Sequence, residues 1–135
     1  YLITFVKPGD NLAPIDHLPN DFPVEQWQEW ASPVWMTVNQ SNVLNVKATK
    51  EKGDERHLCP LQLDVIERAL VLWSRAGDVV LSPFMGIGSE GVTSLKLGRK
   101  FIGTELKESY WRQASRYLDA QDRQDDLFAR EVEAA

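Results

Sequence analysis

The sequence predicts an α/β fold in which a partial, doubly wound sheet has mostly parallel strands. Three observations predict it: an apolar run at residues 79–81, a glycine-bearing turn at 86–88 and a second apolar run at 101–103. A short apolar run between chain breakers is typical of a parallel strand that is covered on both faces. Because a helix-length segment separates the two runs, we expect a strand–helix–strand unit with helices on both faces of the sheet.

The first 56 residues are expected to hold only short elements. Residues 7–24 contain four prolines, and each proline removes a backbone donor and restricts the residue before it. The predicted elements are a strand at 1–6, a short helix at 24–30, an extended piece at 33–38 and a loop at 39–56.

The second half of the chain is expected to be more regular. Apolar residues recur every three or four positions between Leu63 and Trp73, which is the period of a helix with one buried face. Pro60 suits the first turn of that helix. Two further helices are predicted, from Ser89 to about Leu97, closed by Gly98, and from Lys107 to about Phe128, followed by a fraying tail.

The turn and the second strand together suggest a ligand site. Gly86 and Gly88 have no Cβ, so the backbone can turn sharply and a ligand can approach it closely. Glu105 follows about 20 residues later, where an acid at the end of a strand accepts hydrogen bonds from ribose hydroxyls. The spacing therefore predicts a ligand that carries adenosine.

Two kinds of adenosine ligand remain open at this point. The string GIGSEG at residues 86–91 satisfies the G-x-G-x-x-G pattern of nicotinamide and flavin sites. However, four residues separate the predicted strand from the first glycine, and Glu90 would bring negative charge toward a pyrophosphate. S-adenosylmethionine carries no phosphate and would not be repelled.

Three strings occur in an order that resembles a known family: HLCPLQ at 57–62, SPFMGIG at 82–88 and FIGTEL at 101–106. They are similar to the carboxyl-terminal half of the permuted amino-group DNA methyltransferases, and phage and prophage members look closest. The resemblance covers residues 57 to about 118, and residues 1–9 resemble the family's last sheet strand. It implies a division into residues 1–56, with a variable target-recognition-like segment, and an S-adenosylmethionine-binding subdomain at 57–135.

The resemblance also implies a role for individual residues. The family usually has Asp where this chain has Ser82, and a hydroxyl cannot supply the charge that makes a hydrogen bond roughly twice as strong. Glu105 would hold the ribose. Beside the methionine part of the cofactor would lie His57, Pro60, Leu61 and Gln62, and the turn beneath it would be lined by Ser82, Phe84, Gly86 and Gly88.

The residues that perform the chemistry in that family are not found in the sequence. The family's catalytic tetrapeptide, Asp-Pro-Pro-Tyr or a close variant, does not occur in these 135 residues, so no catalytic residue is assigned. The resemblance then implies that double-stranded DNA is met through a complete enzyme, with a separate catalytic half or a second copy as partner. A noncatalytic cofactor-binding module and an NAD-type domain remain as alternatives.

Composition limits the partners that the chain can bind alone. A formal charge of −5 argues against an autonomous nucleic-acid binder, because duplex affinity depends mainly on neutralising phosphates. The single Cys59 and the absence of zinc-type spacing favour a reducing cytoplasm and no metal. Nothing resembles a signal peptide or a membrane span.

Two further groups of residues could suggest contacts with nucleic acid. Acidic residues are interleaved with Lys47, Lys50, Lys52 and Arg56, so these cations are expected to belong to a solvated loop. The side chains of Trp27, Trp30, Trp35 and Met36 are expected to pack within the protein rather than to stack on bases.

Overall fold

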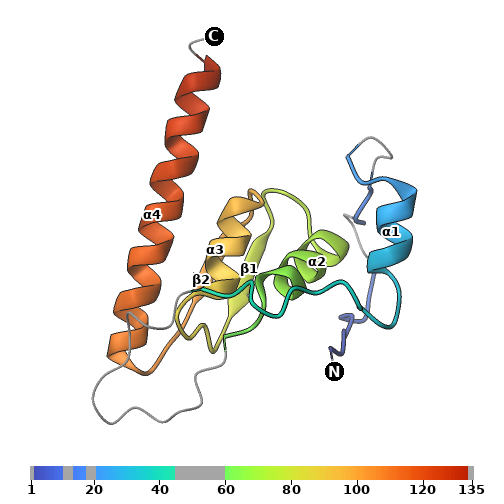
Figure 1. Ribbon diagram of the computed structural model, residues 1–135, viewed down its shortest axis with the longest axis horizontal. Coiled ribbons are helices and arrows are strands. Elements are labelled where there is room, and N and C mark those ends of the chain that lie inside the picture. Colours follow the sequence, from blue (N-terminus) through green and yellow to red (C-terminus); the bar gives the residue numbers. More distant parts are fainter. Residues whose placement is uncertain (1, 11–13, 18–20, 45–59, 134–135) are drawn as a thin grey trace.

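A computed structural model describes residues 2–10, 14–17, 21–44 and 60–133, with side chains up to residue 124, and shows an α/β fold (Figure 1). The segment 1–9 therefore lies mostly inside the described residues, whereas the basic loop at 47–56 lies outside them. The elements in chain order are α1 (Val24–Trp30), α2 (Leu63–Trp73), β1 (Val79–Ser82), α3 (Ser89–Lys96), β2 (Lys100–Gly103) and α4 (Glu108–Glu133).

Within the described residues the sheet consists of β1 and β2, which run parallel. Val79 is paired with Lys100 and Ser82 with Gly103, so the two strands are in register along their whole length. The helix α3 connects them, as a parallel pair requires. The predicted strand–helix–strand unit is therefore present.

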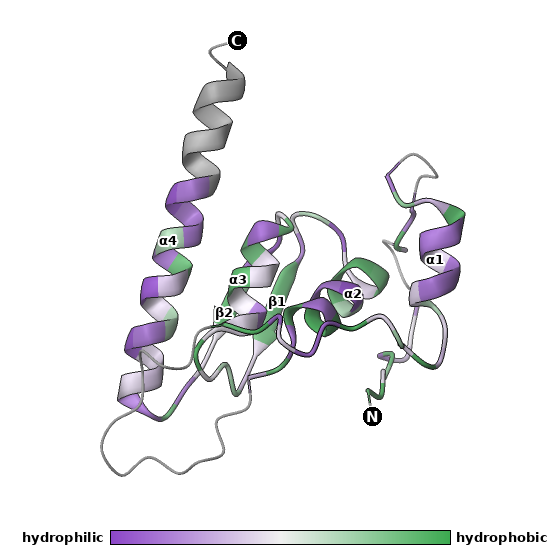
Figure 2. Cartoon of the chain, in the orientation of Figure 1, coloured by the Kyte–Doolittle hydropathy of each residue, from purple (hydrophilic) through white to green (hydrophobic). Residues whose placement is uncertain are grey.

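The helices cover one face of this sheet. Both strands contact α3, and α2 and α4 each pack against α3 rather than against the strands. On the opposite face Val79, Leu81 and Ile102 are 58%, 65% and 56% exposed, although the strands are hydrophobic (Figure 2). In the described part of the chain, α2, α3 and α4 lie on one face of the sheet, and helices on the second face stay an expectation.

A glycine brings α3 close to its neighbours. A Cβ at Gly91 would lie 2.6 Å from Leu118 and 2.7 Å from the ring of Phe101. A Cβ fits there only if the side chains of Leu118 and Phe101 shift. Ala114 of α4, one helical turn before Leu118, is fully buried and lies against Gly88.

Arg99 ties the carboxyl end of α2 to the start of β2. Its guanidinium donates hydrogen bonds to the carbonyl of Ser74 at 2.7 Å and to that of Leu97 at 2.6 Å. Burial lowers the pKa of Arg99, and the nearby Asp78 acts in the opposite direction. An arginine remains charged under these conditions, so it caps the helix end as a cation.

Several predicted boundaries differ from the structure. Residues 2–6 form no strand, and Phe5 and Val6 are almost fully exposed, because neither strand of the sheet pairs with them. A turn at Met36 and Thr37 interrupts the predicted extended piece at 33–38. The last helix continues to Glu133 instead of fraying from residue 129. In the described residues, no helix is long and apolar enough to cross a membrane.

Candidate functional site

The loop between β1 and α3 is fastened to the residue that follows β2. The amide of Met85 donates to the carbonyl of Thr104 at 3.0 Å, and the amide of Thr104 donates to the carbonyl of Ser82 at 3.0 Å. The hydroxyl of Thr104 donates to the carbonyl of Pro83 at 2.7 Å. Because the pairing continues beyond the strands, the glycine turn stays beside the carboxyl end of β2.

Glu105 meets the glycine turn directly. One carboxylate oxygen accepts a hydrogen bond from the amide of Gly86 at 3.0 Å, and the other accepts one from the amide of Lys107 at 2.8 Å. Each oxygen of an ionised carboxylate has a second lone pair, so two backbone bonds do not exhaust its capacity. The acid and the turn are together, as the spacing predicts, and their binding of a nucleoside stays a prediction.

The two glycines of the turn differ in what surrounds them. Both have a positive φ, +54° at Gly86 and +91° at Gly88, which other residues rarely adopt. A Cβ at Gly86 would meet nothing within 4 Å, whereas one at Gly88 would lie 3.1 Å from the Cβ of Ala114. Gly86 therefore leaves open space for a ligand, while Gly88 lets α3 pack against α4.

A groove of about 320 Å³ opens where these elements meet. It is lined by Pro83 and Phe84 from the turn and by Thr104, Glu105 and Leu106 after β2. Phe84 is 85% exposed, so the groove presents an aromatic face and a carboxylate together. This volume lies at the lower end of the range for small-molecule sites, and its position at the carboxyl ends of parallel strands is where α/β sheets bind ligands.

The other predicted site residues that the structure describes are not part of the groove's lining. Ser82 is buried beneath the turn. Gln62 caps the amino end of α2, with its carbonyl accepting from the amides of Val65 and Ile66. Pro60 and Leu61 come just before this cap, and His57 lies outside the described residues.

Two residues that hold the turn in place were missed in the sequence analysis. Met85 and Ile87 are buried, at 5% and 3% exposure, and anchor the turn in the interior. They alternate with Gly86 and Gly88 in the string FMGIG. That alternation of large apolar residues with glycines is the signal that could have identified them.

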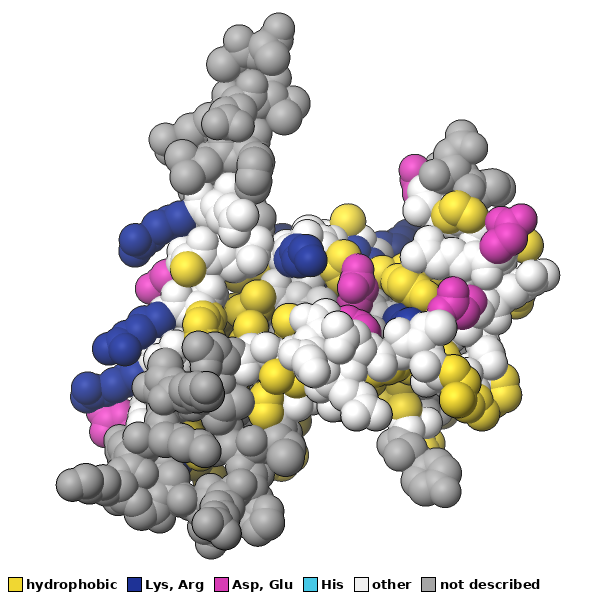
Figure 3. Space-filling view, in the orientation of Figure 1, with side chains coloured by type: hydrophobic (Ala, Val, Ile, Leu, Met, Phe, Trp, Pro, Cys, Tyr) yellow, Lys and Arg dark blue, Asp and Glu magenta, His cyan; other side chains and the backbone are white. Residues whose placement is uncertain are grey.

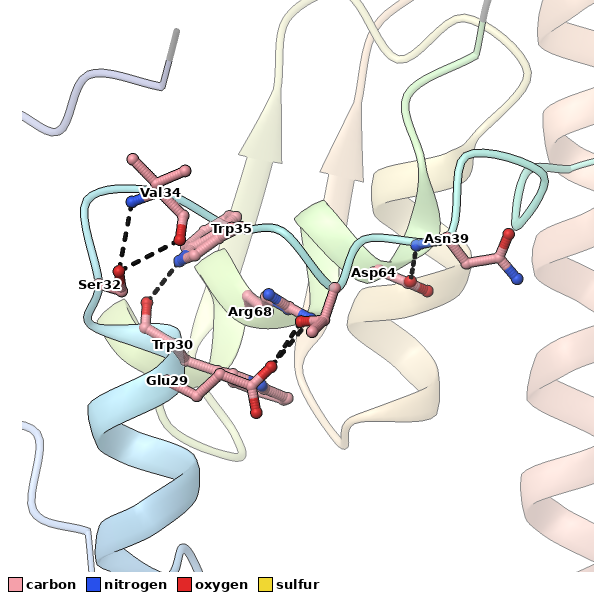
Figure 4. A network of polar contacts seen from close by, with 9 residues as sticks. Glu29, Trp30, Ser32, Val34, Trp35, Asn39, Asp64 and Arg68 are labelled. Carbon is pink, nitrogen blue, oxygen red and sulfur yellow. Dashed lines mark hydrogen bonds and ion pairs between the residues drawn. The ribbon is translucent and has the colours of Figure 1, made fainter.

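A second cluster joins the segment after α1 to α2 (Figure 4). The guanidinium of Arg68 lies 5.5 Å from the ring centroid of Trp30 and 5.4 Å from that of Trp35, and it donates to the hydroxyl of Thr37 at 2.8 Å. Trp35 in turn donates to the carbonyl of Trp30 at 2.7 Å. The prediction that these residues pack is therefore confirmed for Trp30 and Trp35, whereas Trp27 is about half exposed and Met36 is largely exposed.

Two carboxyl groups have pKa values that the structure shifts in opposite directions. Hydrogen bonds from the amide of Asn39 and the side chain of Asn42 lower the pKa of Asp64. Burial raises the pKa of Glu90, in the first turn of α3 after the glycine turn. Among the described residues, no group of three or more potential ligands is placed to hold a metal ion.

Charge is distributed unevenly over the chain. Residues 8–46 contain five acids and no lysine or arginine. Acidic side chains are prominent over the α1 part, whereas lysine and arginine side chains lie along the outer edge of α4 (Figure 3). Because duplex DNA is held through its phosphates, residues 8–46 supply no cationic contact for it.

Comparisons with known proteins point to one family. The profile of a family described as DNA methylase matches residues 4–116. The type II methyltransferase M2.DpnII of Streptococcus pneumoniae is 36% identical over 72 residues, covering 53% of this chain and 27% of that protein. M.BglI of Bacillus subtilis is 32% identical over 111 residues, covering 82% of this chain and 28% of that protein.

A solved structure shares the fold. A Thermus thermophilus protein assigned as a DNA modification methylase, crystallised with S-adenosyl-L-methionine, superposes with a TM-score of 0.62 and 24% identity. The match covers 86% of this chain and 41% of that protein. The chain spans about a quarter of the length of the two curated relatives that it matches.

Proposed function

The chain belongs to the DNA methylase family, and on this premise we propose that it is the S-adenosylmethionine-binding part of an enzyme that methylates the exocyclic amine of adenine or cytosine in double-stranded DNA. The observation that carries the proposal is the hydrogen bond from the amide of Gly86 to Glu105, which lines the groove. It combines a ribose-binding acid with a turn that has open space on its ligand side.

The chemistry of the groove fits this cofactor. The carboxylate of Glu105 has free lone pairs for the ribose hydroxyls, and the exposed ring of Phe84 offers an apolar surface to adenine. Glu90 is half-buried in the first turn of α3, and burial raises its pKa. Ionised Glu90, in the first turn of α3, would repel a pyrophosphate, which disfavours an NAD-type function, although the raised pKa reduces this repulsion as the pH falls.

In this proposal the chain binds and orients, and the catalytic tetrapeptide is outside these residues. S-adenosylmethionine, when bound, supplies a methyl group on a positively charged sulfur. Glu105 would hold the ribose, and the hydroxyl of Ser82 would form a hydrogen bond at the amino-acid end. The target base would be turned out of the duplex so that its amine reaches the methyl group, and the tetrapeptide would accept a hydrogen bond from that amine.

The uncovered face of the sheet is where a catalytic half would dock. Val79, Leu81 and Ile102 are more than half exposed on that face, and β1 is paired on one side within the described residues. An apolar face beside an unpaired strand edge is suited to a further α/β unit that extends the sheet. The alternative is that a second copy of this chain docks on the same face.

Titration calorimetry tests the cofactor. We expect S-adenosylmethionine and S-adenosylhomocysteine to bind and NAD not to bind; binding of NAD alone would overturn the proposal. Glu108→Gln is a matched control, because Glu108 is exposed and pairs with Arg112 on α4. Its affinity for the cofactor should be unchanged.

Complementation tests the enzyme. A candidate amino-terminal half that carries the tetrapeptide is added, and transfer of a labelled methyl group to DNA is measured. Transfer that requires both chains supports the proposal. If the chain binds the cofactor but no such half gives methyl transfer, the chain is a noncatalytic binding module. Ser82 favours this second candidate, because its hydroxyl is neutral where the family usually has a charged Asp.

A further inference from the structure

The segment from Glu29 to Asn42 is fastened to α2 at two successive turns of that helix. At the second turn, Arg68 is only 6% exposed and lies between the rings of Trp30 and Trp35. Its guanidinium also lies 3.9 Å from the carboxylate of Glu29. A planar cation can contact two aromatic faces and still donate in its own plane, which an ammonium group cannot do.

At the first turn, Asp64 holds the other end of the segment. One carboxylate oxygen accepts from the amide of Asn39 at 2.7 Å, and the other accepts from the side-chain amide of Asn42. Figure 4 shows Asp64 and Arg68 on the same side of α2, facing the segment. The two residues are four positions apart, so they lie one above the other on the helix.

The same contacts lead to the residues that are proposed to meet the cofactor. The amide of Leu63, the first residue of α2, donates to the carbonyl of Asn42 at 2.8 Å. Leu63 directly follows Gln62, whose carbonyl accepts from the first turn of the helix. Any change in the backbone at residues 60–62 therefore acts on the segment through a hydrogen bond and one helical turn.

We propose that Asp64 and Arg68 are positioning residues that couple S-adenosylmethionine binding at the amino end of α2 to the docking of residues 29–42 on that helix. The inference rests on the proposed function, because it needs the cofactor to bind there. Coupling is reciprocal: if the cofactor favours the docked segment, the docked segment favours the cofactor by the same factor. The segment, which has no lysine or arginine, then acts through its position rather than by holding phosphates.

Hydrogen exchange together with calorimetry tests the coupling on the full chain. We expect S-adenosylmethionine to slow exchange of the amides in residues 29–44 by at least about threefold. In Asp64→Asn this slowing should disappear, and the cofactor should bind about three- to tenfold more weakly, as the loss of such hydrogen bonds predicts. Arg68→Lys should act in the same direction, because an ammonium group keeps the charge but not the double ring contact.

A neighbouring residue provides the control. Glu67 is on the same helix but takes no part in the contacts of the segment, so Glu67→Gln should retain both the slowing and the affinity. Two outcomes would overturn the coupling alone. In one, the cofactor binds the unsubstituted chain without changing hydrogen exchange in residues 29–44. In the other, the cofactor binds Asp64→Asn with unchanged affinity. Failure of the unsubstituted chain to bind the cofactor in the calorimeter overturns the proposed function as well.

Discussion

The β1–α3–β2 unit and the segment on α2 are held together by different forces. The unit has parallel backbone pairing, a glycine against an aromatic ring, and a turn anchored by the buried Met85 and Ile87. The segment is held by one buried cation between two indole rings and by one carboxylate. Close packing in the β1–α3–β2 unit leaves little room for added side-chain volume, whereas the attachment of the segment depends on a few polar atoms. The two regions should therefore fail separately.

Gly91→Ala should have the largest effect and should act on the unit. The added methyl group would lie under 3 Å from Leu118 and Phe101, and such overpacking costs about 3 kcal/mol. Urea denaturation should show this loss in the free energy of unfolding of the unit. An unchanged midpoint would mean that α3 does not lie so close to α4.

Arg68→Ala should free the segment while the unit stays folded. It removes two ring contacts and the hydrogen bond to Thr37, which together are worth about 2 kcal/mol. Tryptophan fluorescence should shift to the red at low urea, before the main transition of circular dichroism. If both signals change together, the two regions unfold as one and the comparison fails.

Glu105→Ala should act on the groove without freeing the segment. Removal of the carboxylate leaves the amide of Gly86 unpaired and removes the ribose acceptor, so binding of S-adenosylmethionine should weaken by about 1.5 kcal/mol, roughly tenfold. Calorimetry measures this change. Unchanged affinity would remove Glu105 from the site, and Glu108→Gln serves as the control on the same side of the molecule.

Glu90→Gln should have the smallest effect, and its size depends on pH. Burial raises the pKa of Glu90, so the folded state binds a proton more tightly than the unfolded state does, and stability falls as pH rises through the folded pKa. Glutamine carries no charge and so removes the free-energy cost of burying the ionised carboxylate. The melting temperature should rise by no more than about 2 °C at pH 7 and should match the unsubstituted chain near pH 3. A lower melting temperature at pH 7 would show that the charge of Glu90 is stabilising.

The comparison also explains what could be predicted from the sequence. The strands β1 and β2, the helices α1 to α4, and the meeting of Glu105 with the glycine turn follow from apolar period, glycine positions and spacing, which act over short distances. The Arg68 cluster joins residues about 30 positions apart, and no local pattern marks a buried arginine. The strand expected at residues 1–6 was wrong because pairing needs a partner that local propensity cannot supply.

The carboxylate of Glu105 is already fixed by two backbone amides before any ligand arrives. Because the carboxylate is already held in one rotamer, binding of a nucleoside in the groove should cost little side-chain conformational entropy at Glu105. The heat-capacity change of association should then reflect dehydration of the ligand and of Phe84, with little contribution from folding of the loop.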